Sequence, residues 1–427
     1  MVAASFFAGL LALIALGTPI AFAMAIVGAV GLLWAGGLDA VVIMLGSMAR
    51  ESAIVYEFIT IPMFLLMAEF VLKSGVTDDL FRAGAAWFGR FPGGLGIATA
   101  FSGAGFGAIC GSSTASAATL SSTSLMAMLK HGYEPRMASG CVAVSGTLAM
   151  LIPPSIIMMV YGLIANVNIA RLLMAGVIPG LLVTLTIVMT VYVLVKLDPR
   201  RAPMSAAVPL RERLRLLKSV LPVLLLFGAI TAVVYSGIAT PTETAALAAF
   251  FGGVLYVSRG KASKASFIEL MGRATRTSCM IAFIVFGAKV FALFFAMTHV
   301  TQDVVGWVGT LAVEPWVIIL ALVFMYLMLG FFLDQMAILV LTVPVVAPLV
   351  SALGYDLVWF GIIMIIVAEI GLVTPPVGLN CFVVSKYSKL PVALVFRGCF
   401  PYVLSMGATI ALLLVFPQLV LWLPDNM

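Results

Sequence analysis

The sequence predicts an all-α polytopic membrane protein made of two inverted repeats. Three observations predict this fold class. Hydrophobic residues make up 63% of the 427 residues and charged residues only 9%, whereas a soluble domain carries about 25% charged residues. Apolar runs of about 17–25 residues, the length that crosses a bilayer as a helix, recur along the whole chain. Two of these runs are cut by a double proline, at Pro153-Pro154 and at Pro375-Pro376.

Short motifs recur at one separation along the chain. A single repeated dipeptide carries no information, but several in the same order indicate an internal duplication. Three dipeptides recur 222 residues apart and a fourth recurs 224 apart: Pro153-Pro154 with Pro375-Pro376, Gly132-Tyr133 with Gly354-Tyr355, Thr18-Pro19 with Thr240-Pro241, and Val76-Thr77 with Val300-Thr301.

We expect the first repeat at residues 1–195. The opening residues include no basic residue and no clear cleavage site, so the first span is expected to be retained. The expected segments are apolar runs at 2–16, 19–35 and 53–72, an amphipathic stretch at 77–91, a re-entrant hairpin at 93–130, a broken helix at 137–168 and a span at 171–196. A linker at 196–219 follows, and its seven Lys and Arg residues place it in the cytoplasm.

We expect the second repeat at residues 220–427, on the same plan. Its expected segments are spans at 220–237 and 241–257, a basic amphipathic piece at 261–277, a span at 278–297, an amphipathic arm at 300–313, a hairpin at 315–352, a broken helix at 358–388 and a last span near 401–421.

The distribution of basic residues supports the inverted arrangement. Five crossings per repeat is an odd number, so the second repeat must enter the membrane from the opposite side. With the linker in the cytoplasm, the cytoplasmic segments hold 20 of the 23 Lys and Arg residues. The arm at 73–91 is basic, while its counterpart at 299–314 has no Lys or Arg. This pattern follows the positive-inside rule and predicts both termini on the outer face.

The double prolines predict two breaks in membrane helices. Proline lacks a backbone donor and its ring clashes with the preceding turn, so each helix must stop there. Unsatisfied carbonyls at membrane depth are tolerated only where they are buried in protein or line a polar cavity. Two breaks in corresponding places of two repeats are therefore a pointer to the binding site of a transporter.

A hydroxyl-rich segment lies in the middle of the first expected hairpin. Nine of the fourteen residues at 111–124 are Ser or Thr, and none is charged. Hydroxyl and carbonyl oxygens are hard ligands that suit a cation such as sodium. The alternative is close helix packing through small residues, and the sequence does not exclude either.

A few charged residues lie inside apolar runs. At the separation of 222, Asp334 corresponds to Ser112, and a carboxylate at membrane depth is a candidate functional group; the alternative is a helix cap that faces water. Glu369 precedes the second break and either binds a cation or proton or pairs with a neighbouring helix. The roles of Glu57, Glu69 and Lys289 stay open.

Thr240 to Glu243 has a structural explanation. Thr at the cap, Pro at the first helical position and Glu three residues after the cap form a capping box. No Walker A, G-x-S-x-G or H-E-x-x-H motif occurs in the chain. We therefore expect a secondary active transporter and not an enzyme.

In these motifs the chain resembles the large membrane (M) subunit of tripartite ATP-independent periplasmic (TRAP) transporters. The resemblance covers nearly the whole chain. It depends on the order and spacing of five motifs: Gly111 to Ser116, Ile152 to Ser155, Gly237 to Glu243, Asp334, and Glu369 to Asn380.

The resemblance implies a function and partners. It implies an elevator-type secondary transporter of a bacterial inner membrane that uses sodium ions to take up an organic-acid anion. It also implies a small four-helix membrane subunit and a periplasmic substrate-binding protein that delivers the anion. The substrate stays open, and so do the sodium stoichiometry and the oligomeric state. Sialic acid, C4-dicarboxylates, keto acids and sugar acids all fit.

The resemblance also implies site residues. One sodium site would involve Ser112, Ala149, Ile152 and Pro154, and its repeat mate Asp334, Gly371, Thr374 and Pro376. Family members often have Gly where this chain has Ala149, and a carbonyl ligand survives that change. Substrate contacts would come from Ser113, Thr114, Ser116, Ser155, Gly378 and Asn380.

Three other functions fit parts of the pattern. A stand-alone sodium/dicarboxylate symporter of the related elevator class would need no binding protein. A channel would use rings of hydroxyls and carbonyls to conduct ions without coupling. A membrane enzyme fits least, because the chain has neither a catalytic set nor a sizeable soluble domain.

Overall fold

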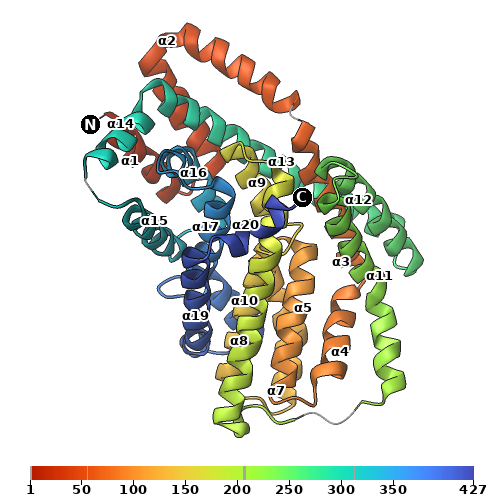
Figure 1. Ribbon diagram of the computed structural model, residues 1–427. Coiled ribbons are helices and arrows are strands. Elements are labelled where there is room, and N and C mark those ends of the chain that lie inside the picture. The colour runs from red at the N-terminus through yellow and green to blue at the C-terminus, as the bar shows by residue number, and fades with distance from the viewer. Residues whose placement is uncertain (1, 55, 205–207, 312) are drawn as a thin grey trace.

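The computed structural model describes residues 2–54, 56–204, 208–311 and 313–427 (Figure 1). Every regular element in these ranges is a helix or a helical turn, which confirms the predicted all-α class. Long helices lie side by side in the lower part of the molecule, and α2 extends along its upper edge in this view (Figure 1).

The first half of the chain contains ten α-helices and three short helical turns within the described residues. They are α1 (Val2–Ala15), α2 (Ile20–Ile54), the 3-10 turn η1 (Tyr56–Ile59), α3 (Thr60–Lys73), α4 (Val76–Phe88), α5 (Gly94–Cys110), α6 (Ser113–Leu120), the π-helical turn η2 (Ser121–Leu125), α7 (Met126–Lys130), α8 (Pro135–Thr147), the 3-10 turn η3 (Leu148–Met150), α9 (Ile156–Ala165) and α10 (Ile169–Leu197).

The second half follows a short turn, η4 (Pro199–Arg201). Its helices are α11 (Leu210–Tyr235), α12 (Pro241–Ser258), α13 (Lys264–Met297), α14 (Val300–Thr310), α15 (Pro315–Gly330), α16 (Gln335–Ala352), α17 (Leu357–Gly371), α18 (Leu379–Ser388), α19 (Val392–Val415) and α20 (Gln418–Asp425).

Several boundaries differ from those expected from hydropathy. α2 continues to Ile54 and changes direction at Gly37, whose φ of 76° suits glycine. α11 begins at Leu210, inside the expected linker, because residues 210–218 are good helix formers. α13 joins the expected basic piece and the following span into one helix of 34 residues. The last long helix, α19, begins at Val392 and not near residue 401.

Many of the helices are long and apolar enough to cross a membrane. Six single helices within the described residues meet this criterion. The segment made of η1, α3 and α4 bends by 65° between α3 and α4, and it is the seventh if it forms one span. Five shorter apolar helices accompany them, among them α5, α9, α15 and α17. The helices therefore indicate a multi-pass membrane protein, and ten crossings stay a prediction.

One group of helices, called the frame below, consists of α2, α3, α11, α12 and α13. α2 packs along α13 and α3 packs along α12. A Cβ added to Gly28 of α2 would lie 2.9 Å from the backbone nitrogen of Phe291 on α13, so only glycine permits this approach. The hydroxyls of Thr60 and Thr242 are 2.7 Å apart and join α3 to α12 in the interior.

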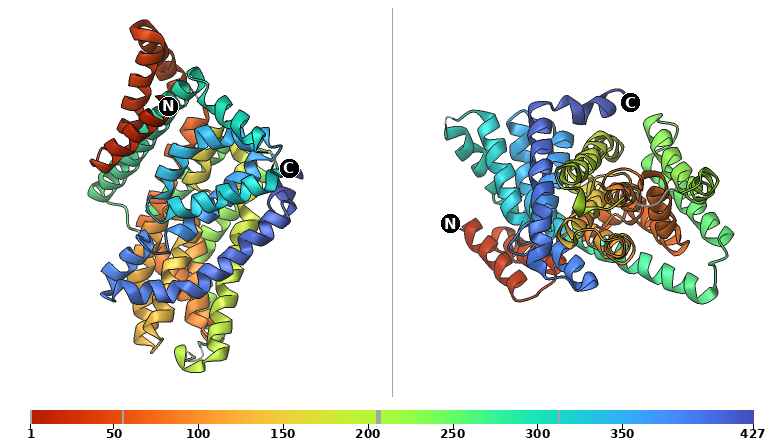
Figure 2. Two further views of the ribbon diagram at one scale, coloured as in Figure 1. Left: turned by 90° about the vertical axis from the view of Figure 1, so that its left-hand side faces the viewer. Right: turned by 90° about the horizontal axis from the view of Figure 1, so that it is seen from below.

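The inner group consists of α5 to α9 and α15 to α18, with η2 and η3. α8 packs against α5, α6 and α19, while α17 packs against α15 and α16. Its contacts with the frame include those of α13 with α9 and α16, and of α3 with α5. The chain termini lie apart, with α1 on one side and α20 on the other (Figure 2). The functional residues predicted from the sequence all belong to the inner group.

Candidate functional site

Each double proline separates two helices of the inner group. The first break lies between α8 with η3 and the start of α9 at Ile156. Ser155 shapes this break, because its hydroxyl donates to the carbonyl of Met150 at 2.6 Å and caps the nitrogen of Met158 at 3.5 Å. The second break lies between α17 and α18, where the backbone nitrogen of Asn380 donates to the carbonyl of Leu372 at 3.1 Å.

The breaks leave free the carbonyl groups that the sequence points to. Within the described residues, no hydrogen bond ends at the backbone oxygens of Ile152, Pro154, Thr374 or Pro376. These four residues lie in the non-helical segments before α9 and before α18, so their oxygens have no helical partner. Free carbonyl oxygens are the hard donors that a sodium ion requires, so these four residues fit such an ion.

Each predicted hairpin has its tip at the start of a helix. α5 and α6 join at Gly111 and Ser112, and the φ of 58° at Gly111 permits the sharp turn. The hydroxyl of Ser112 caps α6 through the nitrogen of Ala115 at 3.4 Å. α15 and α16 join at residues 331–334, and Asp334 is the residue before α16. Both tips therefore place an oxygen-bearing side chain at a helix N-terminus.

A cavity of about 720 Å³ lies where the tips, the breaks and the frame meet. Hydroxyl and amide groups gather on the tip side of this cavity, and apolar side chains cover most of the frame side. Its lining includes Gly111 to Thr114, Asp334 to Ala337, Met150, Ile156, Ile157, Leu372, Leu379, Pro19 to Phe22 and, from α13, Arg276, Thr277, Met280, Ile281, Phe283 and Ile284.

The first residues of four helices line this one cavity. They are Ser113 and Thr114 of α6, Ile156 of α9, Gln335 of α16 and Leu379 of α18. The N-terminus of a helix carries unpaired backbone N–H groups and the positive end of the helix dipole. Four such helix ends at one cavity make it favourable for a negatively charged group.

A glycine joins each hairpin to the neighbouring break. A Cβ added to Gly107 of α5 would lie 2.7 Å from the backbone nitrogen of Ala149. A Cβ added to Gly330 of α15 would lie 3.0 Å from the Cα of Gly371. Ala149 and Gly371 are the corresponding predicted sodium ligands of the two halves. Both predicted ion sites therefore touch a hairpin through a contact that has no room for a side chain.

Several polar side chains of the inner group are buried without a full set of partners. Within the described residues, Ser116 Oγ, Asn380 Oδ1 and both carboxyl oxygens of Glu369 make no hydrogen bond. Ser113 is the polar side chain beside Glu369, although no bond of ordinary geometry joins them. Asn380 uses its other atom and donates to the carbonyl of Ala143 at 3.4 Å. These groups lie around the tip of the first hairpin.

The structure brings together part of the predicted site. Of the predicted ion ligands, Ser112 and Asp334 line the cavity; of the predicted substrate contacts, Ser113 and Thr114 do. Ser155 and Asn380 are fully buried and do not line it. The remaining predicted residues that do not line this cavity are Ala149, Ile152, Pro154, Gly371, Thr374, Pro376, Ser116 and Gly378. Thr374 instead lines a separate pocket of about 270 Å³ with Arg136 and Arg397.

Sequence reasoning missed the contribution of α13 to the cavity. Arg276 and Thr277 line it, as does Gln335, which follows Asp334 and donates to the carbonyl of Ile365 at 3.1 Å. Hydropathy places Arg276 in a cytoplasmic segment, but α13 is one continuous helix and presents it to the cavity. Gln335 could have been predicted to line the site, because it directly follows Asp334 in the sequence.

The structure shows the contacts of residues whose roles the sequence left open. Glu69 pairs with Arg273 at 2.9 Å, and this contact joins α3 to α13. Glu57 and Lys289 line a second polar pocket of about 590 Å³, together with Asn166 and Asn168. The predicted capping box at Thr240 and Glu243 is confirmed, since both of its hydrogen bonds are present.

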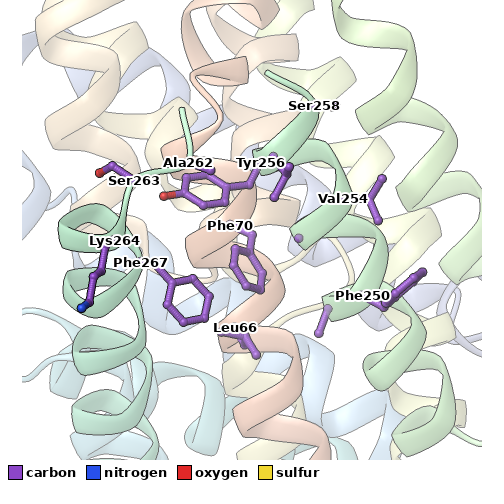
Figure 3. A pocket seen from close by; sticks show the side chains of 13 residues that line it. Leu66, Phe70, Phe250, Val254, Tyr256, Ser258, Ala262, Ser263, Lys264 and Phe267 are labelled. Atoms are coloured by element: carbon purple, nitrogen blue, oxygen red, sulfur yellow. The ribbon is translucent and has the colours of Figure 1, made fainter. Parts of the chain in front are cut away.

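A further groove of about 920 Å³ is apolar and lies on the frame. It is lined by aromatic and aliphatic side chains of α3, α12 and the start of α13, including Phe70, Tyr256 and Phe267 (Figure 3). The ring centroid of Phe70 lies 5.7 Å from that of Tyr256 and 6.3 Å from that of Phe267. Its composition suits lipid or another apolar helix and not an anion.

The family follows from the whole length of the chain. The family model described as the tripartite ATP-independent periplasmic transporter, DctM component, matches residues 7–419. The chain belongs to the TRAP large permease family. The three relatives described below are named as transporter permeases, which indicates a transporter and not an enzyme. The family and the apolar helices together indicate a multi-pass membrane protein.

Three curated relatives illustrate the range of the family. The C4-dicarboxylate TRAP transporter large permease protein DctM of Pseudomonas aeruginosa is 34% identical over 87% of this chain and 86% of its own. The sialic acid TRAP transporter large permease protein SiaM of Vibrio cholerae is 31% identical over 87% and 86%. The ectoine/5-hydroxyectoine TRAP transporter large permease protein UehC of Ruegeria pomeroyi is 29% identical over 92% and 93%.

A solved structure has a similar fold. The crystal structure of the YdaH transporter of Alcanivorax borkumensis matches with a TM-score of 0.65 at 15% identity, over 90% of this chain and 89% of that one. At this identity the likeness concerns the fold alone. It agrees with the all-helical fold described above.

Proposed function

We propose that this TRAP permease carries out sodium-coupled uptake of an organic-acid anion that a periplasmic substrate-binding protein delivers. The observation that carries the proposal is the convergence of four helix N-termini on one cavity with the hydroxyls of Ser112, Ser113 and Thr114. Such a cavity favours an anionic group. Relatives are named for C4-dicarboxylates, sialic acid and ectoine, which carry a carboxylate, and for isethionate, which carries a sulfonate.

Two sodium sites are proposed at the breaks. The free carbonyl oxygens of Ile152 and Pro154 support the site that also includes Ser112 and Ala149. The free carbonyl oxygens of Thr374 and Pro376 support the corresponding site of the second repeat, which also includes Asp334 and Gly371. Bound sodium would order the residues around each tip, so that the anion site forms only with the ions in place. Coupling of this kind is reciprocal, and the anion then raises the affinity for sodium by the same factor.

The mechanism proposed is an elevator within an inverted-repeat fold. The elements of residues 94–197 and 315–415 follow one order, and the two tips, at Ser112 and Asp334, lie 222 residues apart. The inner group would move as a body against the frame. The frame supports this role because α2 and α13 are held together by close glycine contacts.

The remaining parts of the proposal concern location and partners. The family implies a bacterial inner membrane, a small four-helix membrane subunit and a periplasmic binding protein. The cytoplasmic linker and the outer position of both termini follow from the distribution of Lys and Arg. The comparisons give no support for a stand-alone symporter, which becomes an outcome of the test below.

Uptake in proteoliposomes tests the proposal. The chain is reconstituted with its small subunit and its binding protein, and labelled succinate, N-acetylneuraminate and ectoine are offered with and without an inward sodium gradient. Uptake that requires both the gradient and the binding protein is expected. Sodium-driven uptake without the binding protein would indicate the stand-alone symporter instead. Flux that ignores the gradient would indicate a channel.

A further inference from the structure

Arg276 is the cationic side chain of the cavity. It lies on α13, on the frame side, and its side chain is exposed. Within the described residues its guanidinium makes no hydrogen bond and no ion pair, whereas Arg273, one turn earlier, pairs with both Glu69 and Glu269. The positive charge of Arg276 is therefore not compensated by the protein.

The charges around the cavity leave Arg276 free for a ligand. Asp334 is the other charged residue of the lining, and within the described residues no ion pair of 4.0 Å or less joins the two. Most of the remaining frame lining is apolar. A guanidinium with five donors in a planar fork matches the two oxygens of a carboxylate. Thr277, the next residue, adds a hydroxyl to the same lining.

We infer that Arg276 binds the carboxylate of the transported organic acid from the frame side of the cavity, which the helix N-termini of the two tips also line. The inference deepens the proposed function, on which it depends, and adds a contact from outside the inner group. The anion would then lie between a fixed cation and the tips that carry the ion sites.

The position of Arg276 has a consequence for the transport cycle. α13 is fixed to α2, because Gly28 and Gly287 leave no room for side chains between the two helices. If the inner group moves against the frame, the tips leave Arg276 behind. The contact with the carboxylate then exists only while the tips face this part of α13. Arg276 would set the affinity for the anion in that state and would release it when the tips move away.

A purely topological role makes a different prediction. An arginine that only anchors α13 at the membrane surface affects insertion, and its loss would lower the amount of folded protein. It would not change the affinity of the folded protein for an anion. Affinity and yield therefore separate the two roles.

Equilibrium binding to the purified chain with its small subunit tests the inference. The probes are labelled succinate, N-acetylneuraminate and ectoine in saturating sodium. Arg276→Gln is expected to weaken binding of the probe that the wild type accepts by roughly tenfold or more, the change expected for a lost bond to a charged group. Arg276→Lys should recover part of the loss. Lys264→Gln removes a charge from the same helix outside this cavity and should stay within twofold of the wild type.

Each result has one meaning. Equal affinity of Arg276→Gln and the wild type would overturn the inference and leave the proposed function intact, even if the variant yields less protein. Lack of binding of all three probes to the wild type would count against both. If Arg276→Gln fails to fold, Arg276→Met keeps the apolar stem and the same expectation applies.

Discussion

Gly330→Ala tests the contact between the second hairpin and the second break. Gly330 ends α15, and a Cβ there would lie 2.9 Å from the carbonyl oxygen of Ala368 and 3.0 Å from the Cα of Gly371. Carbon atoms ordinarily approach to about 3.5–4.0 Å. Because these neighbours are backbone atoms, no side-chain rotation relieves the clash, and α15 and α17 must separate by roughly half an ångström.

The magnitude follows from this overlap. Overpacking of this kind costs about 1–3 kcal/mol. Gly371 is a predicted sodium ligand, so a displacement of α17 at this point disturbs the ion-bound arrangement. If the cost falls on that arrangement, the sodium concentration that gives half-maximal uptake rises by about 5–150-fold. If it falls on the whole fold, the melting temperature in detergent decreases instead.

The assay combines sodium-dependent uptake with thermal unfolding in detergent. Gly228→Ala is the matched control, because a Cβ at Gly228 of α11 meets no atom within 4 Å. We expect Gly330→Ala to differ from this control in the sodium requirement, in the melting temperature, or in both. If the two variants behave alike in both measurements, the contact between Gly330 and Gly371 does not position the predicted ion site.

Three further predictions concern other parts of the molecule. Asp334→Asn removes the charge at the second tip, so the sodium concentration that gives half-maximal uptake should rise. Adding Gln335→Glu to this variant places a carboxylate one residue away, and the double variant should not recover the wild-type value. Thr60→Val leaves the buried hydroxyl of Thr242 without its partner at 2.7 Å and should cost about 1–3 kcal/mol; the double variant with Thr242→Val should unfold at a higher temperature than Thr60→Val alone, and a lower temperature would contradict this reading. Glu243→Ala removes the capping box of α12 and should lower the melting temperature slightly with unchanged uptake kinetics; changed kinetics would give Glu243 a functional role.

The sequence by itself determined the fold class, the broken helices and the candidate polar residues. Hydropathy requires helices in a bilayer, since only a helix satisfies its own backbone there. The double prolines Pro153-Pro154 and Pro375-Pro376 lie between helices, whereas a single proline such as Pro179 lies inside one. Two adjacent residues without a backbone donor made the two breaks predictable from local chemistry. The run of hydroxyls after Gly111 and the isolated Asp334 were equally visible, because uncompensated polarity in an apolar run is rare.

Only the tertiary structure decided which of these residues meet. Ser112 and Asp334 share a cavity because two hairpins pack against one frame, whereas Thr374 opens into a different pocket. Hydropathy split α13 into a loop piece and a span, so Arg276 was counted only as a topological charge. The continuous helix brings it beside four helix N-termini. Contacts between segments distant in sequence depend on packing, and residue type and spacing alone do not specify them.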